Sequence, residues 1–346
     1  MKLLERWEKR RSGMTGLLTA ASVVFGSALA AQAAEDVNIA LIYSVGPEGS
    51  WDKTVQEALD RVADSNPGGL TVTYDAKDAV YGDKAENVIN LLAKSGKYDI
   101  ILSASAHSDQ IKNLHAKYPE TMFVSLGSGN YNAGENHYLA LGRVHEAAYL
   151  LGILAAGKSK TGVIGAVASF PADDVNDQLN AYLAGARSVN PDAKLQLSFI
   201  ESWYDPPKAT EATYALAAAG ADVVYQMAGE VYEACRDKDI LCFSKYRDTS
   251  SMAPDVVLSG TQLLWDPVLN WMLDEWSNAK TDGGSFNGNT DAVWFGLAEG
   301  GSDISPYHGL ADQVPADLQE QVEQAKADII AGKIDVPLIL EIPTSD

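Results

Sequence analysis

Aromatic and oxygen-bearing side chains recur in this chain at points where a strand is expected to end and a helix to begin. The aromatic candidates for ligand contact are Trp51, Phe170, Trp203, Tyr204 and Trp265. The polar candidates are Asp52, Ser103, Ser105, Asp109, Asn176, Tyr246 and Asp248. Flat rings offer apolar faces and the polar groups offer a few directed hydrogen bonds, a combination typical of sites for small molecules. We therefore expect a binding site rather than a set of reactive groups.

Each candidate also has an ordinary structural role as its alternative. The aromatic side chains can pack in the core or on a lobe surface, and Trp203 can shape its own loop. Asp52 can cap the helix that it starts, and Asp109 lies early in its own helix. Trp51 and Phe170 are the strongest candidates for ligand contact, because both lie in loops between a strand and the following helix.

Reactive chemistry finds little support in the sequence. His107 and Asp109 fall close together, yet no nucleophile accompanies them, and the motifs of serine hydrolases and zinc proteases are missing. None of the five His residues has another His or a Cys at the spacing of metal ligands. We expect no enzyme, no phosphate-binding loop, no metal ion and no cofactor.

The first 33 residues have the order of a secretory signal. Five basic residues and two acids lie in positions 1–11, an uncharged apolar stretch covers positions 15–30, and Ala31-Gln32-Ala33 has the small-x-small pattern of a signal-peptidase site. The apolar stretch is short for a membrane span of about 20 residues, and an N-terminal membrane anchor is the alternative. No Cys lies at the cleavage site. We expect a soluble protein of the periplasm that starts near Ala34.

The rest of the chain is strongly acidic. The whole sequence has 26 Lys and Arg against 47 Asp and Glu, a net charge of −21, although its first eleven residues are basic. A negative field of this size repels nucleic acid and anionic lipid, so we expect neither as a partner. Solvated helix faces are a sufficient explanation for most of these charges.

Two cysteines, Cys235 and Cys242, lie seven residues apart. In an oxidising compartment they can form one disulfide. The alternative is a pair of small buried side chains at the end of a helix and the start of a strand. The sequence leaves this choice open.

Short apolar runs alternate with longer helical stretches after residue 34. Strands are predicted at residues 37–43, 70–74, 99–103, 122–125, 161–168, 194–200, 222–226 and 292–297. Helices are predicted at residues 52–65, 81–95, 107–117, 146–156, 174–189, 208–219, 265–276 and 315–331. This alternation predicts an α/β protein with parallel, doubly wound sheets.

The strand and helix order starts afresh after Gly142, which predicts two Rossmann-like lobes. The first lobe is predicted to hold residues 34–142 and about 263–290, and the second residues 143–262 and about 291–346. Ligands of open parallel sheets bind outside the carboxyl ends of the strands. The expected rim loops are residues 44–52, 103–109, 125–130, 169–174, 202–207, 227–230 and 244–248. Two lobes that face each other across these loops form a cleft that closes on its ligand.

Five segments resemble the basic membrane protein family of ABC-transporter solute-binding proteins, which includes purine nucleoside receptors. They are residues 146–152 (EAAYLLG) with 159–165 (SKTGVIG), then 185–192 (GARSVNPD), 203–206 (WYDP) and 220–224 (GADVV). Each segment is weak alone, but their order and spacing are specific. The resemblance covers nearly all of the chain after the signal. It implies a type I periplasmic binding protein fold, a purine-type ligand, and delivery to an inner-membrane permease with its ATPase.

Within this family, the chain looks closest to members that bind free nucleobases. Nucleoside-binding members carry Asp-Lys-Ser-Phe-Asn after the first strand, where this chain has residues 52–56 (DKTVQ) and lacks the aromatic residue. They also carry an Asp that holds the ribose hydroxyls; Tyr246 stands at that position here, and only Asp248 is retained. The resemblance therefore implies a ligand without ribose, such as adenine, xanthine or hypoxanthine.

Other ligands and another role stay open. A nucleoside, a riboflavin-like ring or a sugar can bind to the same fold. A sensor that docks on a membrane receptor is the alternative to a transport component. Glu146 matches a Glu of the family and is expected to form a hydrogen bond at the hinge. Lys245 is expected to be solvated, with an anionic or keto group of the ligand as its alternative partner, and the protein is expected to be a monomer.

Overall fold

The computed structural model describes residues 35–47, 49–104, 107–127, 134–281 and 285–346. The predicted signal peptide and Ser105 lie outside these residues. Within the described part of the chain, no helix has the length and apolar character needed to cross a membrane.

The first sheet has the strand order β11-β5-β4-β3-β1-β2, and all of its strands pair in parallel. Its strands are β1 (Asp36–Ile42), β2 (Thr71–Lys77), β3 (Ile100–Ser103), β4 (Met122–Leu126), β5 (His137–Gly142) and β11 (Val293–Phe295). Successive side chains of a strand point to opposite faces. Val37, Ile39 and Leu41 therefore pack on one side of the sheet, whereas Ala40 and Ile42 pack on the other.

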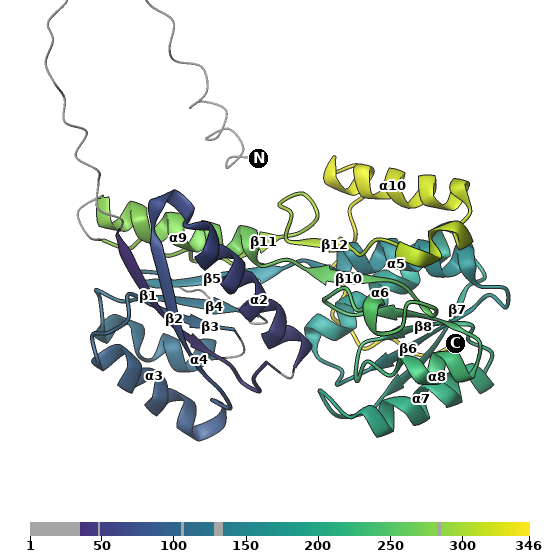
Figure 1. Cartoon of the computed structure of the whole chain (residues 1–346), viewed down its shortest axis with the longest axis horizontal. Coiled ribbons are helices and arrows are strands. Elements are labelled where there is room, and N and C mark those ends of the chain that lie inside the picture. The colour runs from purple at the N-terminus through teal and green to yellow at the C-terminus, as the bar shows by residue number, and fades with distance from the viewer. Residues whose placement is uncertain (1–34, 48, 105–106, 128–133, 282–284) are drawn as a thin grey trace, which may run out of the picture. The chain divides into compact units, whose positions relative to one another are not determined.

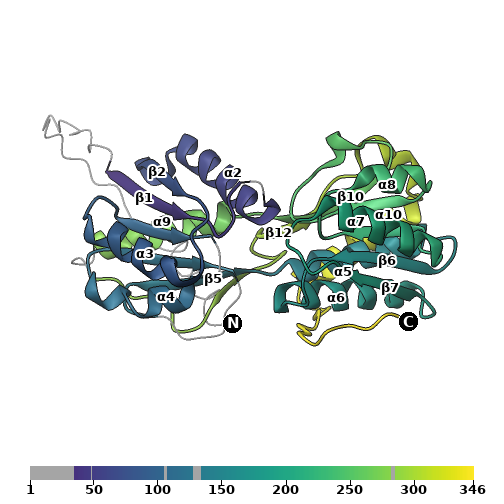
Figure 2. The ribbon, with the colours of Figure 1, turned by 90° about the horizontal axis from the view of Figure 1, so that it is seen from below.

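Helices cover both faces of the first sheet. One layer consists of α2 (Ser50–Ser65) and α9 (Asp266–Thr281), and the other of α3 (Ala85–Lys94) and α4 (Ser108–Lys112). Figure 1 shows α2 and α9 beside this sheet, and Figure 2 shows α3 and α4 on the side away from α2. Apolar residues at helical spacing in α2, such as Val55, Leu59 and Val62, form the stripe that faces the sheet.

The second sheet repeats this arrangement with the order β12-β10-β9-β8-β6-β7. Its strands are β6 (Val163–Ala168), β7 (Lys194–Phe199), β8 (Val223–Gln226), β9 (Leu241–Ser244), β10 (Val257–Leu263) and β12 (Ser302–Ile304). On one face lie α5 (Val144–Lys158), α6 (Asp173–Val189) and α10 (Ala316–Ile330); on the other lie α7 (Pro206–Ala218) and α8 (Tyr232–Asp237). Two doubly wound α/β lobes are thus confirmed, except that β12 runs antiparallel to β10.

Three segments join the two sheets: one after β5, one between β10 and α9, and one between β11 and β12. Glu146 accepts a hydrogen bond from the backbone N–H of Leu297 at 2.8 Å, which confirms the hinge hydrogen bond expected of it. A Cβ at Gly296 would collide with the same carboxylate. The backbone N–H of Arg143 also donates to the carbonyl of Phe295 at 2.8 Å. The crossing segments therefore support one another.

The structure corrects several details of the predicted elements. Residues 293–295 were expected in the second lobe, but they form β11 and pair with β5 of the first sheet, where they cover an edge that would otherwise be open. No residue range was predicted for β5, β9, β10 or β12. β9 and β12 are short, with four and three residues. The helix predicted at residues 107–117 is divided into α4 and a short 3-10 turn, His115–Lys117.

Cys235 of α8 and Cys242 of β9 are joined by a disulfide, with their Cα atoms 6.2 Å apart. The amide nitrogen of Gln226 lies 3.6 Å from each sulfur. The open choice between a disulfide and two free thiols is therefore resolved in favour of the disulfide.

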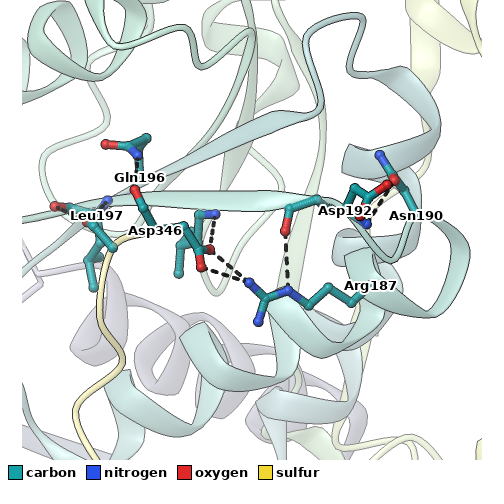
Figure 3. Close-up of polar contacts among 9 residues, drawn as sticks. Arg187, Asn190, Asp192, Gln196, Leu197 and Asp346 are labelled. Atoms are coloured by element: carbon teal, nitrogen blue, oxygen red, sulfur yellow. Dashed lines mark hydrogen bonds and ion pairs between the residues drawn. The ribbon is translucent and has the colours of Figure 1, made fainter.

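The chain ends along the outer strand of the second sheet. Arg187 of α6 donates to both carboxylate oxygens of Asp346 at 2.9 Å, and the backbone N–H of Leu195 donates to one of them at 2.9 Å (Figure 3). The side chain of Gln196 donates to the main-chain oxygen of Asp346 at 2.7 Å. These bonds hold the C-terminal segment against β7, whose free edge it partly covers.

Candidate functional site

A cavity of about 250 Å³ lies between the loops that follow the strands of the two sheets. Its lining comes from the loops after β1 and β4 in the first lobe, and from those after β6, β7, β8 and β9 in the second. Six of the seven expected rim loops contribute, and none of the described residues of the seventh, 103–104 and 107–109, is part of the lining. The strands that precede these loops run in parallel, so their carboxyl ends lie at one edge of each sheet. The loops that follow them therefore meet at that edge.

Aromatic rings stand on both walls of the cavity. Trp51 comes from the first lobe, and Trp203, Tyr204 and Tyr246 come from the second. The rings of Trp51 and Tyr246 meet edge to face with centroids 5.4 Å apart. Trp203 and Tyr204 are 54% and 51% exposed, although both are large apolar side chains. Such exposure is typical of a site that is covered when a ligand binds.

Trp51 is held in place from behind. Its indole N–H donates to the carbonyl oxygen of Ala104, and its ring packs edge to face on Trp265 with centroids 5.2 Å apart. Trp265 is fully buried and donates its own N–H to the hydroxyl of Thr54 at 3.0 Å. Trp265 was a candidate for ligand contact, but the structure places it behind Trp51, outside the cavity lining, where it orients that ring.

Phe170 stands in a similar position in the second lobe. It does not line the cavity; its ring lies against Trp203, with centroids 5.1 Å apart and 59° between the planes. The sequence ranks Phe170 with Trp51 because both follow a strand. A position after a strand does not determine where a loop side chain points. The ring of Phe170 points towards the neighbouring loop that holds Trp203.

Asp52 lines the cavity and also shapes its wall. One carboxylate oxygen accepts hydrogen bonds from the backbone N–H groups of Val45 and Gly46, at 3.1 and 2.9 Å. The N-cap of α2 is Gly49, so Asp52 is not the cap that was its alternative role. The carboxylate instead fixes the loop after β1, as backbone N–H donors to a charged acceptor do efficiently.

Two further candidates of the first lobe lie away from the cavity. The hydroxyl of Ser103 is buried at 2.7 Å from Nδ1 of His107, whose other ring nitrogen contacts the carbonyl oxygen of Val80. Asp109 is exposed in the first turn of α4. Ser103 and His107 connect β3, the start of α4 and the loop after β2, which is a structural role.

Asn176 and Asp248 are also engaged elsewhere. The amide of Asn176 donates to the carbonyl oxygen of Leu340 at 2.9 Å and so ties α6 to the C-terminal segment. Asp248 accepts from His308 at 2.6 Å and from the backbone N–H of Ser250 at 2.9 Å, and these partners hold the pKa of its carboxyl below the usual value despite partial burial. Neither residue lines the cavity.

The position of Lys245 differs most from the expected polar site. It was expected to be solvated, but it is 8% exposed and lines the cavity, with its ammonium 4.2 Å from the ring centroid of Tyr246. Burial lowers the pKa of Lys245 to about 8, and the carboxylates of Asp174 and Asp177 act in the opposite direction. The expectation failed because α6, some 70 residues earlier in the chain, covers this side chain.

The α6 carboxylates complete the polar wall. Asp174 lines the cavity and accepts a hydrogen bond from the hydroxyl of Tyr246 at 3.2 Å. Asp177 lies one helical turn deeper, beside a smaller hollow of about 60 Å³, and burial raises the pKa of its carboxyl to about 7. Neither residue was predicted as a site residue from the sequence, although Asp174 lies at the end of an expected rim loop.

Tyr246 links the polar wall to the aromatic wall. Its backbone has φ 68°, in the left-handed region that non-glycine residues rarely adopt. Its N–H donates to the hydroxyl of Thr261 at 3.1 Å, and its own hydroxyl lies 3.3 Å from the amide nitrogen of Gln178. These contacts hold the strained residue so that its ring faces Trp51.

One sequence pattern needs correction from the structure. Residues 152–159 (GILAAGKS) match Gly-x-x-x-x-Gly-Lys-Ser, although no phosphate-binding loop was expected. A phosphate-binding loop requires a glycine-rich turn between a strand and the start of a helix. Here Gly152 and Gly157 lie inside α5, and a Cβ at Gly152 would collide with the carbonyl oxygen of Tyr182. The glycines therefore serve helix packing, and the match does not form a phosphate site.

Two α/β lobes with a cavity at the carboxyl ends of their strands define the type I periplasmic binding protein fold. A solved solute-binding protein of an ABC transporter from Aeropyrum pernix K1 has this fold, with a TM-score of 0.71 and 19% identity over 86% of this chain and 92% of that one. The chain belongs to the Bmp family of PnrA-like ABC transporter substrate-binding proteins, whose family model matches residues 37–339. The expected family is thus confirmed, and with it a small-molecule ligand and a partner permease.

Two relatives differ in the ligand that their names state. A purine-binding protein of Brucella abortus is 27% identical over 92% of this chain and 87% of its own length. A putative ABC transporter glucose-binding protein of Haloferax volcanii is 29% identical over 86% of this chain and 75% of its own length. The family therefore fixes the role of the protein but not its ligand.

Proposed function

We propose that this chain is the periplasmic component of an ABC importer that captures a free purine base between its lobes and delivers it to an inner-membrane permease. In this proposal, the signal is cleaved near Ala33, the mature protein works as a monomer, and it binds its ligand without changing it. The observation that carries the proposal is the cavity with aromatic rings on both walls, Trp51 on one side and Trp203, Tyr204 and Tyr246 on the other.

The size of the cavity supports a base over a nucleoside. Its volume of about 250 Å³ is below the roughly 300–1,000 Å³ of drug-sized ligand sites. A fused bicyclic base needs less room than the same base with a ribose. By the resemblance to the family, Tyr246 also stands at the position where nucleoside-binding members carry an acceptor for ribose hydroxyls.

The aromatic walls support a flat ligand over a sugar. Stacking of a base on an aromatic side chain is worth about 1–3 kcal/mol. Sugars also stack on aromatic rings, but they need several polar partners for their hydroxyls. Besides serine and tyrosine hydroxyls, the described cavity wall offers three charged groups, Asp52, Asp174 and Lys245. Asp52 is already engaged with the backbone.

Calorimetry of the secreted protein tests this proposal with adenine, hypoxanthine, xanthine, their nucleosides, riboflavin and glucose. We expect one base to bind at least about tenfold more tightly than its nucleoside, a difference of about 1.4 kcal/mol. At about a hundred times its dissociation constant, that base should also stabilise the fold by roughly 2.7 kcal/mol in a thermal unfolding experiment. Tighter binding of a nucleoside, of riboflavin or of glucose would contradict the proposed ligand and leave the transport role intact.

A further inference from the structure

Lys245 carries a charge in the cavity wall that meets the ring of Tyr246 but forms no ion pair with a described residue. Among the residues that the structure describes, no carboxylate lies within 4.0 Å of its ammonium and no acceptor forms a hydrogen bond with it, although the side chain is 8% exposed. A buried ammonium that lacks a partner is costly, so proteins keep one only where something else meets it. Its position in the cavity wall indicates that the ligand supplies that partner.

The residues beside Lys245 are arranged as an acceptor next to a donor. Asp174 stands in the same wall, and its carboxylate is oriented by the hydroxyl of Tyr246. The amide nitrogen of Gln178 lies 3.3 Å from that hydroxyl, so Gln178 and Tyr246 together orient the carboxylate of Asp174. Lys245 itself lies over the ring of Tyr246, which leaves its N–H groups for the cavity. The wall thus presents one charged donor and one charged acceptor side by side.

We propose that Lys245 and Asp174 together recognise the lactam edge of an oxopurine, with Lys245 donating to the ring carbonyl oxygen and Asp174 accepting from the adjacent ring N–H. This inference rests on the proposed function and narrows it to bases such as hypoxanthine and xanthine. An ammonium has only donors, and a carboxylate has only acceptors. A C=O group next to an N–H group is the complement of that pair.

Adenine is a poorer complement to the charged donor. Adenine offers a ring nitrogen with one lone pair. The amino group next to this nitrogen is a donor, as the ammonium is, so the two groups cannot bond to each other. A carbonyl oxygen has two lone pairs and more negative charge, so it compensates the buried ammonium better. The site therefore selects by charge as well as by shape.

The test is calorimetry of the full secreted protein with hypoxanthine, xanthine and adenine, for the wild type and for Lys245→Met. Methionine has nearly the same length without the charge. Lys238→Met, an exposed lysine of the same lobe outside the cavity, is the matched control. We expect the wild type to bind an oxopurine at least about tenfold more tightly than adenine, as expected for a charge-assisted hydrogen bond. Lys245→Met should lose most of this preference and change adenine binding by less than about threefold. Lys238→Met should bind all three bases like the wild type.

The outcomes separate this inference from the proposed function. If the wild type binds adenine as tightly as the oxopurines, Lys245 does not select the base, and the inference is overturned while a purine receptor remains. The same follows if Lys245→Met weakens adenine and oxopurines equally. If no purine base binds to the wild type, the proposed function fails, and this inference fails with it. The wild-type ranking of bases decides the matter even if the variant does not fold.

Discussion

The indole ring of Trp51 meets the phenol ring of Tyr246 edge to face, with 5.4 Å between the ring centroids and 79° between the planes. Trp51 belongs to α2 of the first lobe, and Tyr246 follows β9 of the second. The two lobes therefore touch through aromatic rings that also line the cavity. A flat ligand that enters here exchanges a ring-to-ring contact for stacking on its own faces.

Trp51→Ala should weaken binding of the preferred base by about tenfold or more, because one stacking contact is worth about 1–3 kcal/mol. Calorimetry measures this directly. Tyr81→Ala is the control, since Tyr81 is 63% exposed and stands outside the cavity lining. An affinity of Trp51→Ala within about twofold of the wild type would mean that the ligand does not stack on this ring.

Trp203 lines the cavity wall, and Phe170 packs behind it. Their alanine variants compare the effect on binding of a ring in the wall with that of a ring that supports it. Trp203→Ala should weaken binding by about tenfold, because Trp203 lines the cavity. Phe170→Ala should cost only about threefold, because Phe170 acts by holding Trp203 in place. The same calorimetric titrations measure both variants. A larger loss for Phe170→Ala would place the ligand nearer to α6 than the cavity suggests.

Ser50 and Glu230 form a hydrogen bond between the lobes, with 3.3 Å between Oγ and Oε1. Ser50 begins α2, and Glu230 follows β8 with a left-handed backbone, φ 49°. We expect Ser50→Ala and Glu230→Ala each to speed ligand release by about two- to fivefold, in line with about 0.5–1 kcal/mol for one hydrogen bond. Stopped-flow dissociation rates measure this.

The double variant provides the internal control for that pair. If the two residues act through their mutual bond, Ser50→Ala together with Glu230→Ala should release ligand no faster than either single variant, because the bond can be lost only once. Rates that multiply would show that each residue acts alone.

Helix–strand alternation was sufficient to predict the two lobes, and most helices begin and end close to the predicted residues. The apolar periodicity of α2, α6 and α10 carries this information locally, and the rule for strand ends then places the rim loops. The apolar run of β5 is only four residues long, after His137, and its pairing with β4 and β11 identifies it as a strand. Such pairing is a tertiary property.

The site was predictable as a set of loops but not as a set of side chains. Trp51, Trp203, Tyr204, Asp52 and Tyr246 do line the cavity. Lys245 was expected to be solvated, as a lysine after a strand usually is. Its burial depends on α6, which packs over it from far away in the sequence, and no local pattern contains that contact.

Two helices of the second lobe approach closely through glycines. A Cβ at Gly185 of α6 would collide with the carbonyl oxygen of Tyr149 in α5. Gly185→Ala should therefore lower the free energy of unfolding by about 1–3 kcal/mol, the usual effect of overpacking. Urea denaturation measures this. Gly309→Ala is the control, because nothing lies within 4 Å of a Cβ at that position. Equal stability of both variants would show that the helices can move apart freely.

Lys245→Met should stabilise the ligand-free protein even though it weakens ligand binding. Burial lowers the pKa of Lys245 from 10.5 to about 8, with Asp174 and Asp177 of α6 opposing the shift. At neutral pH the ammonium is charged both in the folded and in the unfolded chain, so the folded state carries the cost of removing part of its hydration. Removing it should raise the free energy of unfolding by up to about 3 kcal/mol.

This gain should disappear as the pH rises. From about pH 8 towards 10.5 the folded chain releases the proton of Lys245 while the unfolded chain still holds it. The wild type therefore gains stability relative to Lys245→Met over this window. Urea denaturation of both proteins at neutral and at alkaline pH, with Lys238→Met as the control for an exposed lysine, measures the difference. A difference between wild type and Lys245→Met that is the same at both pH values would show that Lys245 is not a buried charge, and its role in selecting the ligand would lose its physical basis.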